Sequence, residues 1–506
     1  MPFFKNYILN NKIIYLGLIF IISRIFYYEF FNIKFDSWTI DIYWQFYPLD
    51  LLKNDLIQST LYNHYQPPFL NLLVGSLMKI TIHYLFFIQL IFLVFGFLSF
   101  LLIYLISKDF KLSDKTSFLI TTILMLLPTT ILYENHLYKE YITFFLLLWL
   151  FYSTMKILKN FDSLRYVLYI SFSLSLLCLT RETFHILWGY ILIFILQKNM
   201  DFTKKILLFS IFSILVIPFY IKNLILFDKF SLSNSIYEHL NQKIDYVKEM
   251  DDPEKHEKIR NLTFGSYENY RKFKLKTSPL YEIPINSSAY TYKDFLNYEY
   301  KFDNQLLQTN TMYNEIWFEV DKHRKNDFFL VLGEQPLLII LNIFNSITRH
   351  LFASSDYFNF TKHNADKMKF MIKISDCIKL TPVCIYNYGF DWKTSYVGNI
   401  SYMGMDTGPL SYKEKIIFSL QYTNFLLVII YISLLFFLLF NLFSKKNEQD
   451  KIINFWLITF IFIFVSLVVF EDGEIARHRF PFDYLCFLIF LKKLRIKVDL
   501  IFSKKN

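Results

Sequence analysis

The chain has 506 residues, of which 54% are hydrophobic, 20% aromatic and only 19% charged. Soluble chains carry about 25% charged residues, and disordered chains are poor in aromatic ones, so this composition excludes a disordered protein and disfavours a soluble multi-domain enzyme. The formal net charge is +10, and the four cysteines exclude a disulfide-dense scaffold. The basic residues gather in short connections between apolar stretches, so we interpret the charge as a topology signal and expect no nucleic-acid partner.

Ten apolar stretches predict membrane-spanning helices, since a span needs roughly 20 mostly apolar residues. In chain order they lie at about 13–31, 82–107, 116–133, 141–158, 165–180, 184–197, 206–222, 414–443, 452–470 and 481–496. The sequence therefore predicts an all-α transmembrane bundle of about ten helices, with a mixed external segment between spans seven and eight.

Lysine and arginine cluster at every second connection, which predicts that both termini are cytoplasmic. We expect a transmembrane core at 1–222 with a first external loop at 34–81, an external (periplasmic) segment at 223–413, and C-terminal transmembrane helices at 414–506. Within the external segment, 328–347 is apolar but interrupted by Glu334 and Pro336, so we expect an amphipathic or interfacial helix rather than a span.

Two cysteines, Cys377 and Cys384, fall in the predicted external segment. An oxidising exterior would allow a disulfide between them, and two unpaired thiols are the alternative.

The first external loop is rich in polar and aromatic residues. It contains Asp41, then a predicted short helix from Pro48 to about Gln58 whose leucines, Leu49, Leu52 and Leu56, share one face. We expect this face to lie in the membrane interface. A stiff turn that contains His64, Gln66 and two prolines follows, and the assembly could hold Asp41 towards a cleft. Solvated loop acids are the alternative for Asp36 and Asp41.

Three further outer turns gather ionisable groups that are costly near lipid. An acid–histidine pair can hold a divalent ion or position a substrate hydroxyl, and arginines there can bind a phosphate. The alternative is a solvated hairpin for the turn with Glu134 and His136, and an interfacial ion pair for the turn with Arg181. For the turn with Glu474, Arg477 and Arg479, the alternative is an internal salt-bridge cluster. The candidate residues in these turns are Glu134, His136, Arg181, Glu474, Arg477 and Arg479.

An acid in the first external loop, a surface helix and a Pro-Pro turn into the next span resemble the GT-C fold of polytopic glycosyltransferases. That group includes the protein O-mannosyltransferases and the bacterial lipid A aminoarabinose transferases. Asp41 is similar to the first acid of the family's Asp-Glu pair, and Gln66-Pro67-Pro68-Phe69 to its Lys-Pro-Pro-Leu turn. The resemblance covers roughly the first 220 residues; Ile42 and Gln66 depart from the pattern.

The resemblance implies a cell-envelope enzyme of a bacterial cytoplasmic (inner) membrane that moves a sugar from a polyprenyl-phosphate donor to a lipid, glycan or protein acceptor on the outer face. Asp41 would be the general base of an inverting transfer, with His64, Gln66 and the charged outer turns as substrate-binding residues. The sequence identifies no cofactor and no set of metal ligands. A bound divalent cation stays an open alternative. The alternatives are an O-antigen polymerase or ligase and a lipid or polysaccharide transporter.

Overall fold

The structure is a computed structural model. It describes residues 2–37, 39–42, 46–47, 49–159, 163–196, 200–233, 299–302, 305–310, 336–351, 367–378, 424–442, 448–470 and 475–503, with isolated positions between 240 and 364. These residues form helices and one small antiparallel hairpin, β1 (Glu299–Phe302) and β2 (Gln305–Asn310).

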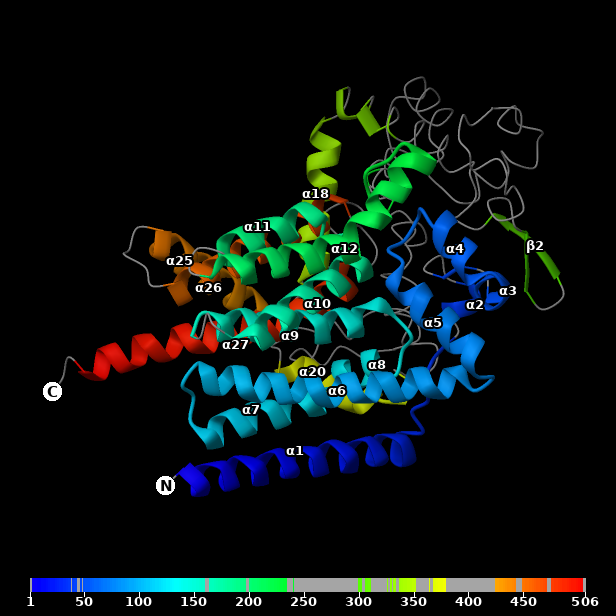
Figure 1. The fold of residues 1–506 in the computed structure, drawn as a ribbon. Coiled ribbons are helices and arrows are strands. Elements are labelled where there is room, and N and C mark those ends of the chain that lie inside the picture. The colour runs from blue at the N-terminus through cyan, green and yellow to red at the C-terminus, as the bar shows by residue number, and fades with distance from the viewer. Residues whose placement is uncertain are drawn as a thin grey trace.

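Long helices run side by side through the molecule and form its body (Figure 1). The N-terminal set is α1 (Pro2–Phe31), α6 (Tyr84–Asp109), α7 (Asp114–Leu126), α8 (Pro128–Glu134), α9 (Lys139–Ile157), α10 (Leu164–Thr180), α11 (Ile186–Leu196) and α12 (Phe202–Phe227). The C-terminal set is α25 (Phe425–Leu442), α26 (Glu448–Phe470) and α27 (Ile475–Ser503).

The apolar helices support a multi-pass membrane protein. In the described part of the chain, four helices are long and apolar enough to cross a membrane, or five if the bent pair α7 and α8 counts as one span. Four shorter apolar helices, at Phe69–Ile80, Leu164–Thr180, Ile186–Leu196 and Phe425–Leu439, do not reach that length. The helical bundle is thus confirmed, and the number of ten spans stays a prediction.

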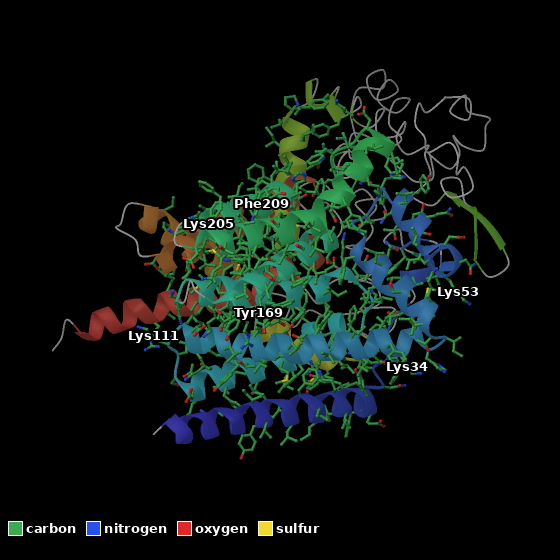
Figure 2. All side chains as sticks on the ribbon, viewed as in Figure 1. Lys34, Lys53, Lys111, Tyr169, Lys205 and Phe209 are labelled. Carbon is green, nitrogen blue, oxygen red and sulfur yellow. The ribbon has the colours of Figure 1, made fainter. Side chains whose placement is uncertain are left out.

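The two ends of the bundle carry different basic residues. The start of α1 and the end of α27 lie on the same side of the molecule, on the left in Figure 1. Lys111 and Lys205, from connections predicted to be cytoplasmic, lie at that side as well, whereas Lys34 and Lys53 of the first external loop lie at the opposite side (Figure 2). These basic residues thus lie at opposite sides of the bundle, and the cytoplasmic orientation of the termini stays a prediction.

Helix α9 is the centre of the bundle. It packs against α6, α10 and α27, and almost all its side chains are buried. Two of its buried hydroxyls bond back to the helix: Thr143 to the Lys139 carbonyl at 2.8 Å and Thr154 to the Phe151 carbonyl at 2.7 Å. A helix buried on every side has no amphipathic stripe, so its central place was not visible in its sequence.

The stretch predicted as a single span at 116–133 is broken. Helices α7 and α8 meet at Leu127 with a bend of 60°, because Pro128 cannot continue the hydrogen-bond ladder of α7. Two side chains of α1 donate hydrogen bonds to carbonyl groups beside the break. Arg24 donates to the Met125 carbonyl at 3.3 Å, and the Tyr27 hydroxyl donates to the Leu126 carbonyl at 2.9 Å.

The first external loop is mostly helical. The predicted helix from Pro48 to Gln58 is instead two helices, α3 (Leu49–Asn54) and α4 (Leu56–Tyr62), and the Pro-Pro turn leads into α5 (Phe69–Ile80). The expectation that their leucine face lies in the membrane interface is wrong, because Leu52 and Leu56 are buried against α5. Gly75 permits this contact, since a Cβ there would lie 2.4 Å from the Leu56 side chain.

Within the predicted external segment, helix α18 (Pro336–His350) confirms an amphipathic helix and begins at the proline. A second helix, α20 (Lys369–Ile378), packs against α8. Near its end Cys377 is disulfide-bonded, and the expected partner, Cys384, lies outside the described residues.

Candidate functional site

The first external loop is hydrogen-bonded to the turn between α8 and α9. The Asp36 amide donates to the Asn135 carbonyl at 2.7 Å, and the Leu137 amide donates to the Asp36 carbonyl at 2.9 Å. Thr39 adds a bond from its hydroxyl to the Leu137 carbonyl at 2.9 Å. These bonds fix the start of the short helix α2 (Thr39–Ile42), in which Asp41 lies. The Asp41 side chain is outside the described residues.

A buried acid–histidine pair lies beside this backbone contact. The Asp36 carboxylate is 3.5 Å from Nδ1 of His136, and both side chains are almost fully buried. The His136 ring stacks on Tyr138, with 5.1 Å between ring centroids. The alternative that Asp36 is a solvated loop acid is therefore wrong, and His136 contacts the loop that carries Asp41.

The turn between α8 and α9 is an interior element, so the alternative of a solvated hairpin is also wrong. Glu134, His136, Lys139 and Glu140 are each no more than 4% exposed. Burial of four ionisable side chains in one turn requires partners for them.

Glu134 has its partners inside the bundle. Arg24 of α1 donates to both carboxylate oxygens at 2.7 Å, and the Tyr141 hydroxyl donates at 2.7 Å. The Arg24 guanidinium also lies 4.0 Å from the Phe20 ring centroid. Glu134 was predicted to bind substrate, which stays a prediction; its contacts give it an internal role. Sequence reasoning missed Arg24, although an arginine inside an apolar helix signals a buried partner.

Lys139 joins the Pro-Pro turn to the turn after α10. Its ammonium donates to the Gln66 amide oxygen at 3.1 Å and to both oxygens of Glu182 at 3.1 Å. Partial burial acts to raise the pKa of the Glu182 carboxyl, but Lys139 and Arg181 outweigh it and lower that pKa to about 2. The Glu182 side chain is 28% exposed, so the ion pair with Lys139 is partly accessible from outside the protein. Lys139 was not among the predicted site residues.

The predicted Arg181 lies in a buried cluster with residues from two other helices. Its Nη1 is 3.9 Å from Glu140, its Nη2 contacts Nδ1 of His478, and that Nδ1 is itself 3.9 Å from Glu140. Arg181 is 1% exposed. The cluster joins α9, the end of α10 and the start of α27.

The predicted Arg479 lies next to that cluster and is also buried. Its Nε is 2.9 Å from Asp483, and its Nη1 donates to the His350 carbonyl at the end of α18. This supports the alternative of an internal salt-bridge cluster for Arg479. Glu474 and the Arg477 side chain lie outside the described residues.

A lysine of α12 holds the turn that precedes the two prolines. The ammonium of Lys222 donates to the carbonyl groups of Thr60, at 3.3 Å, and Asn63. The predicted His64 is 1% exposed, with its ring 5.0 Å from Phe227. Lys222 was also missed, since its partners are backbone carbonyls that have no sequence signature.

The structure thus brings the four predicted polar places together at one end of the bundle. Glu134 and His136 lie in one turn with Lys139 and Glu140; Lys139 bonds Gln66 and Glu182, and Glu140 lies near Arg181 and His478, which precedes Arg479 in α27. Within the described ranges, no group of three or more His, Cys, Asp or Glu side chains is arranged to hold a metal ion. A divalent cation therefore stays a prediction.

No family model, curated protein or solved structure matches this chain.

Proposed function

We propose that this chain is an integral membrane glycosyltransferase of the GT-C type. It would move a sugar from a polyprenyl-phosphate donor to an acceptor at the outer face of the cytoplasmic membrane, with both termini in the cytoplasm. One observation carries the proposal: the loop with Asp41, the Pro-Pro turn, the turn after α10 and the start of α27 all contact the turn at 134–140. Such convergence supports a site where a carboxylate and cations act on one substrate.

In the proposed reaction, Asp41 accepts the proton of an acceptor hydroxyl. The hydroxyl oxygen attacks the anomeric carbon, the bond from that carbon to the phosphate oxygen breaks, and the lipid phosphate leaves with the electron pair. Attack opposite the leaving group inverts the anomeric centre. A positioned general base contributes roughly 10²–10⁴-fold to the rate.

The leaving phosphate requires fixed positive charge in a site of low dielectric. Arg181 and Arg479, predicted for this role, have carboxylate neighbours in Glu140 and Asp483. Lys139 joins them as a candidate, because its ammonium lies at the Gln66 side chain, where the resembled family has a lysine. Arg477 stays a candidate from the sequence.

The proposal is tested in proteoliposomes with a labelled polyprenyl-phosphate sugar and acceptor lipids. The wild-type protein should consume the donor, and Asp41→Asn should lower the turnover roughly 10²–10⁴-fold. Asp55→Asn is the matched control, because Asp55 lies exposed between α3 and α4 and makes no side-chain cap.

Two results would overturn the proposal. Near-normal turnover of Asp41→Asn would remove Asp41 as the base. Movement of the labelled lipid across the bilayer without chemical change, by the wild-type protein, would indicate a transporter instead.

A further inference from the structure

Among the described side chains of α18, the polar ones and Ile339 are buried, whereas other apolar ones are exposed. Its polar residues Asn342, Ser346 and His350 are at most 5% exposed. Its apolar residues Leu337, Ile340 and Phe344 are 65%, 47% and 58% exposed. The spacings of three and four residues place each set on one face.

The polar face of α18 is held inside the protein. The helix packs against α26 and α27. The Ser346 hydroxyl bonds the Asn342 carbonyl at 3.1 Å, and the His350 ring lies 4.7 Å from the Phe464 ring of α26. At the end of the helix, Arg479 of α27 donates to the His350 carbonyl. These contacts fix which face of α18 points outward.

The helix against which α18 packs also exposes apolar side chains. In α26, the candidate membrane span Ile452–Val469 exposes Ile458, Phe462 and Val465. In Figure 1, α18 runs upright, across the direction of α6 and α9. A helix that crosses the spans, with apolar side chains outward, suits the region where the bilayer meets water.

We propose that α18 is embedded in the outer boundary of the bilayer, with Leu337, Ile340 and Phe344 in contact with lipid hydrocarbon. In water this face would be an apolar patch without a partner, whereas in lipid it follows the rule for membrane proteins that polar faces turn inward. Arg479, which follows His478 of the polar cluster, donates a hydrogen bond to the last residue of α18. The lipid-facing side chains of α18 would therefore lie next to the polar site. The inference does not depend on the proposed transferase activity.

The test is nitroxide accessibility in liposomes made of the full chain. Ile340→Cys and Phe344→Cys are labelled separately in a chain with Cys178→Ser and Cys486→Ser, which removes the two free thiols. The lipid reference is Ile22→Cys, 63% exposed on the span of α1, and the water reference is Lys115→Cys at the start of α7. Collision with oxygen reports lipid, and collision with a water-soluble nickel complex reports water.

We expect the oxygen-to-nickel ratio at both α18 positions to be close to that of Ile22 and severalfold above that of Lys115. A ratio like that of Lys115 would overturn the inference, because the face would then be in water. Low collision with both reagents would overturn it as well, because protein would then cover the face. Two label sites keep the test decisive if one variant fails to fold.

Discussion

Two ion pairs, one at each end of the bundle, differ in burial and in how far apart their partners lie in the sequence. At the end that carries both termini, Lys204 and Asp201 are 2.6 Å apart, three residues apart in the chain, and 17% and 66% exposed. At the opposite end, Arg24 and Glu134 are 2.7 Å apart, 110 residues apart in the chain, and 5% and 0% exposed.

This difference separates two uses of charge. Exposed pairs contribute about 0–1 kcal/mol, because water screens them, so the Lys204–Asp201 pair marks a solvated turn. Loss of one partner from a buried pair costs about 3–5 kcal/mol, because the other charge is left without compensation. The pairs at the second end therefore hold distant segments in one arrangement, and they can be tested as structural elements apart from any catalytic role.

The largest effect is expected from Glu134→Ala. This variant leaves the Arg24 guanidinium buried without its carboxylate, and should lower the free energy of unfolding by about 3–5 kcal/mol. Thermal unfolding in detergent measures the loss. Asp201→Ala, at the exposed pair, should cost no more than about 1 kcal/mol.

A double variant sharpens this result. The double variant Arg24→Met with Glu134→Gln removes both charges. Its loss of unfolding free energy should therefore be smaller than the sum of the losses in the two single variants. If the two losses simply add, the pair is not the source of the effect.

A smaller effect is expected from a glycine facing the buried pair. In Gly96→Ala, the new Cβ would lie 2.4 Å from Glu134 Oε2 and 2.7 Å from the Tyr141 hydroxyl, so both must move, at a cost of about 1–3 kcal/mol. Gly17→Ala is the matched control, since its Cβ would lie 3.7 Å from Phe97, in ordinary contact. Its stability should change by less than about 1 kcal/mol. Equal unfolding temperatures for the two variants would contradict the tight packing around Glu134.

The smallest effect is expected on how the stability contribution of Glu182 depends on pH. Its pKa falls from 4.5 to about 2 in the folded protein, because Lys139 and Arg181 outweigh the effect of burial. A lowered folded-state pKa adds stability that is complete above the ordinary pKa and is lost as the pH falls towards 2. The difference in stability between wild type and Glu182→Gln should therefore be constant from about pH 5 to 8 and shrink below about pH 4.5. A difference that persists to pH 2 would assign the effect to shape rather than charge.

The sequence predicted much of the fold because its strongest signals are local. Apolar length located most of the long helices, and the interrupted apolar stretch at 328–347 indicated an amphipathic helix where α18 lies. The same reasoning missed the break at Leu127, although Pro128 signals it, because apolar residues continue on both sides. It also placed the leucine face of α3 and α4 towards lipid, since the spacing of Leu52 and Leu56 does not say which neighbour covers them.

The candidate site was predictable as a set of places but not as a set of contacts. Crowded charges at the outer turns pointed to Glu134, His136 and Arg181. Their partners could not be identified, because Arg24 is 110 residues from Glu134 and His478 is 297 residues from Arg181. Contacts over such separations depend on how the helices pack, which a single sequence does not encode locally.

The hydrogen bonds from α1 to the α7–α8 break have a consequence for biogenesis. Arg24 and Tyr27 leave the ribosome about a hundred residues before the Met125 and Leu126 carbonyl groups that they bond. During membrane insertion, these bonds can therefore form only after α7 has been synthesised. A chain made without α1 would leave the Glu134 carboxylate without Arg24 and the Met125 and Leu126 carbonyl groups without these bonds, which is the kind of defect that quality-control proteases remove.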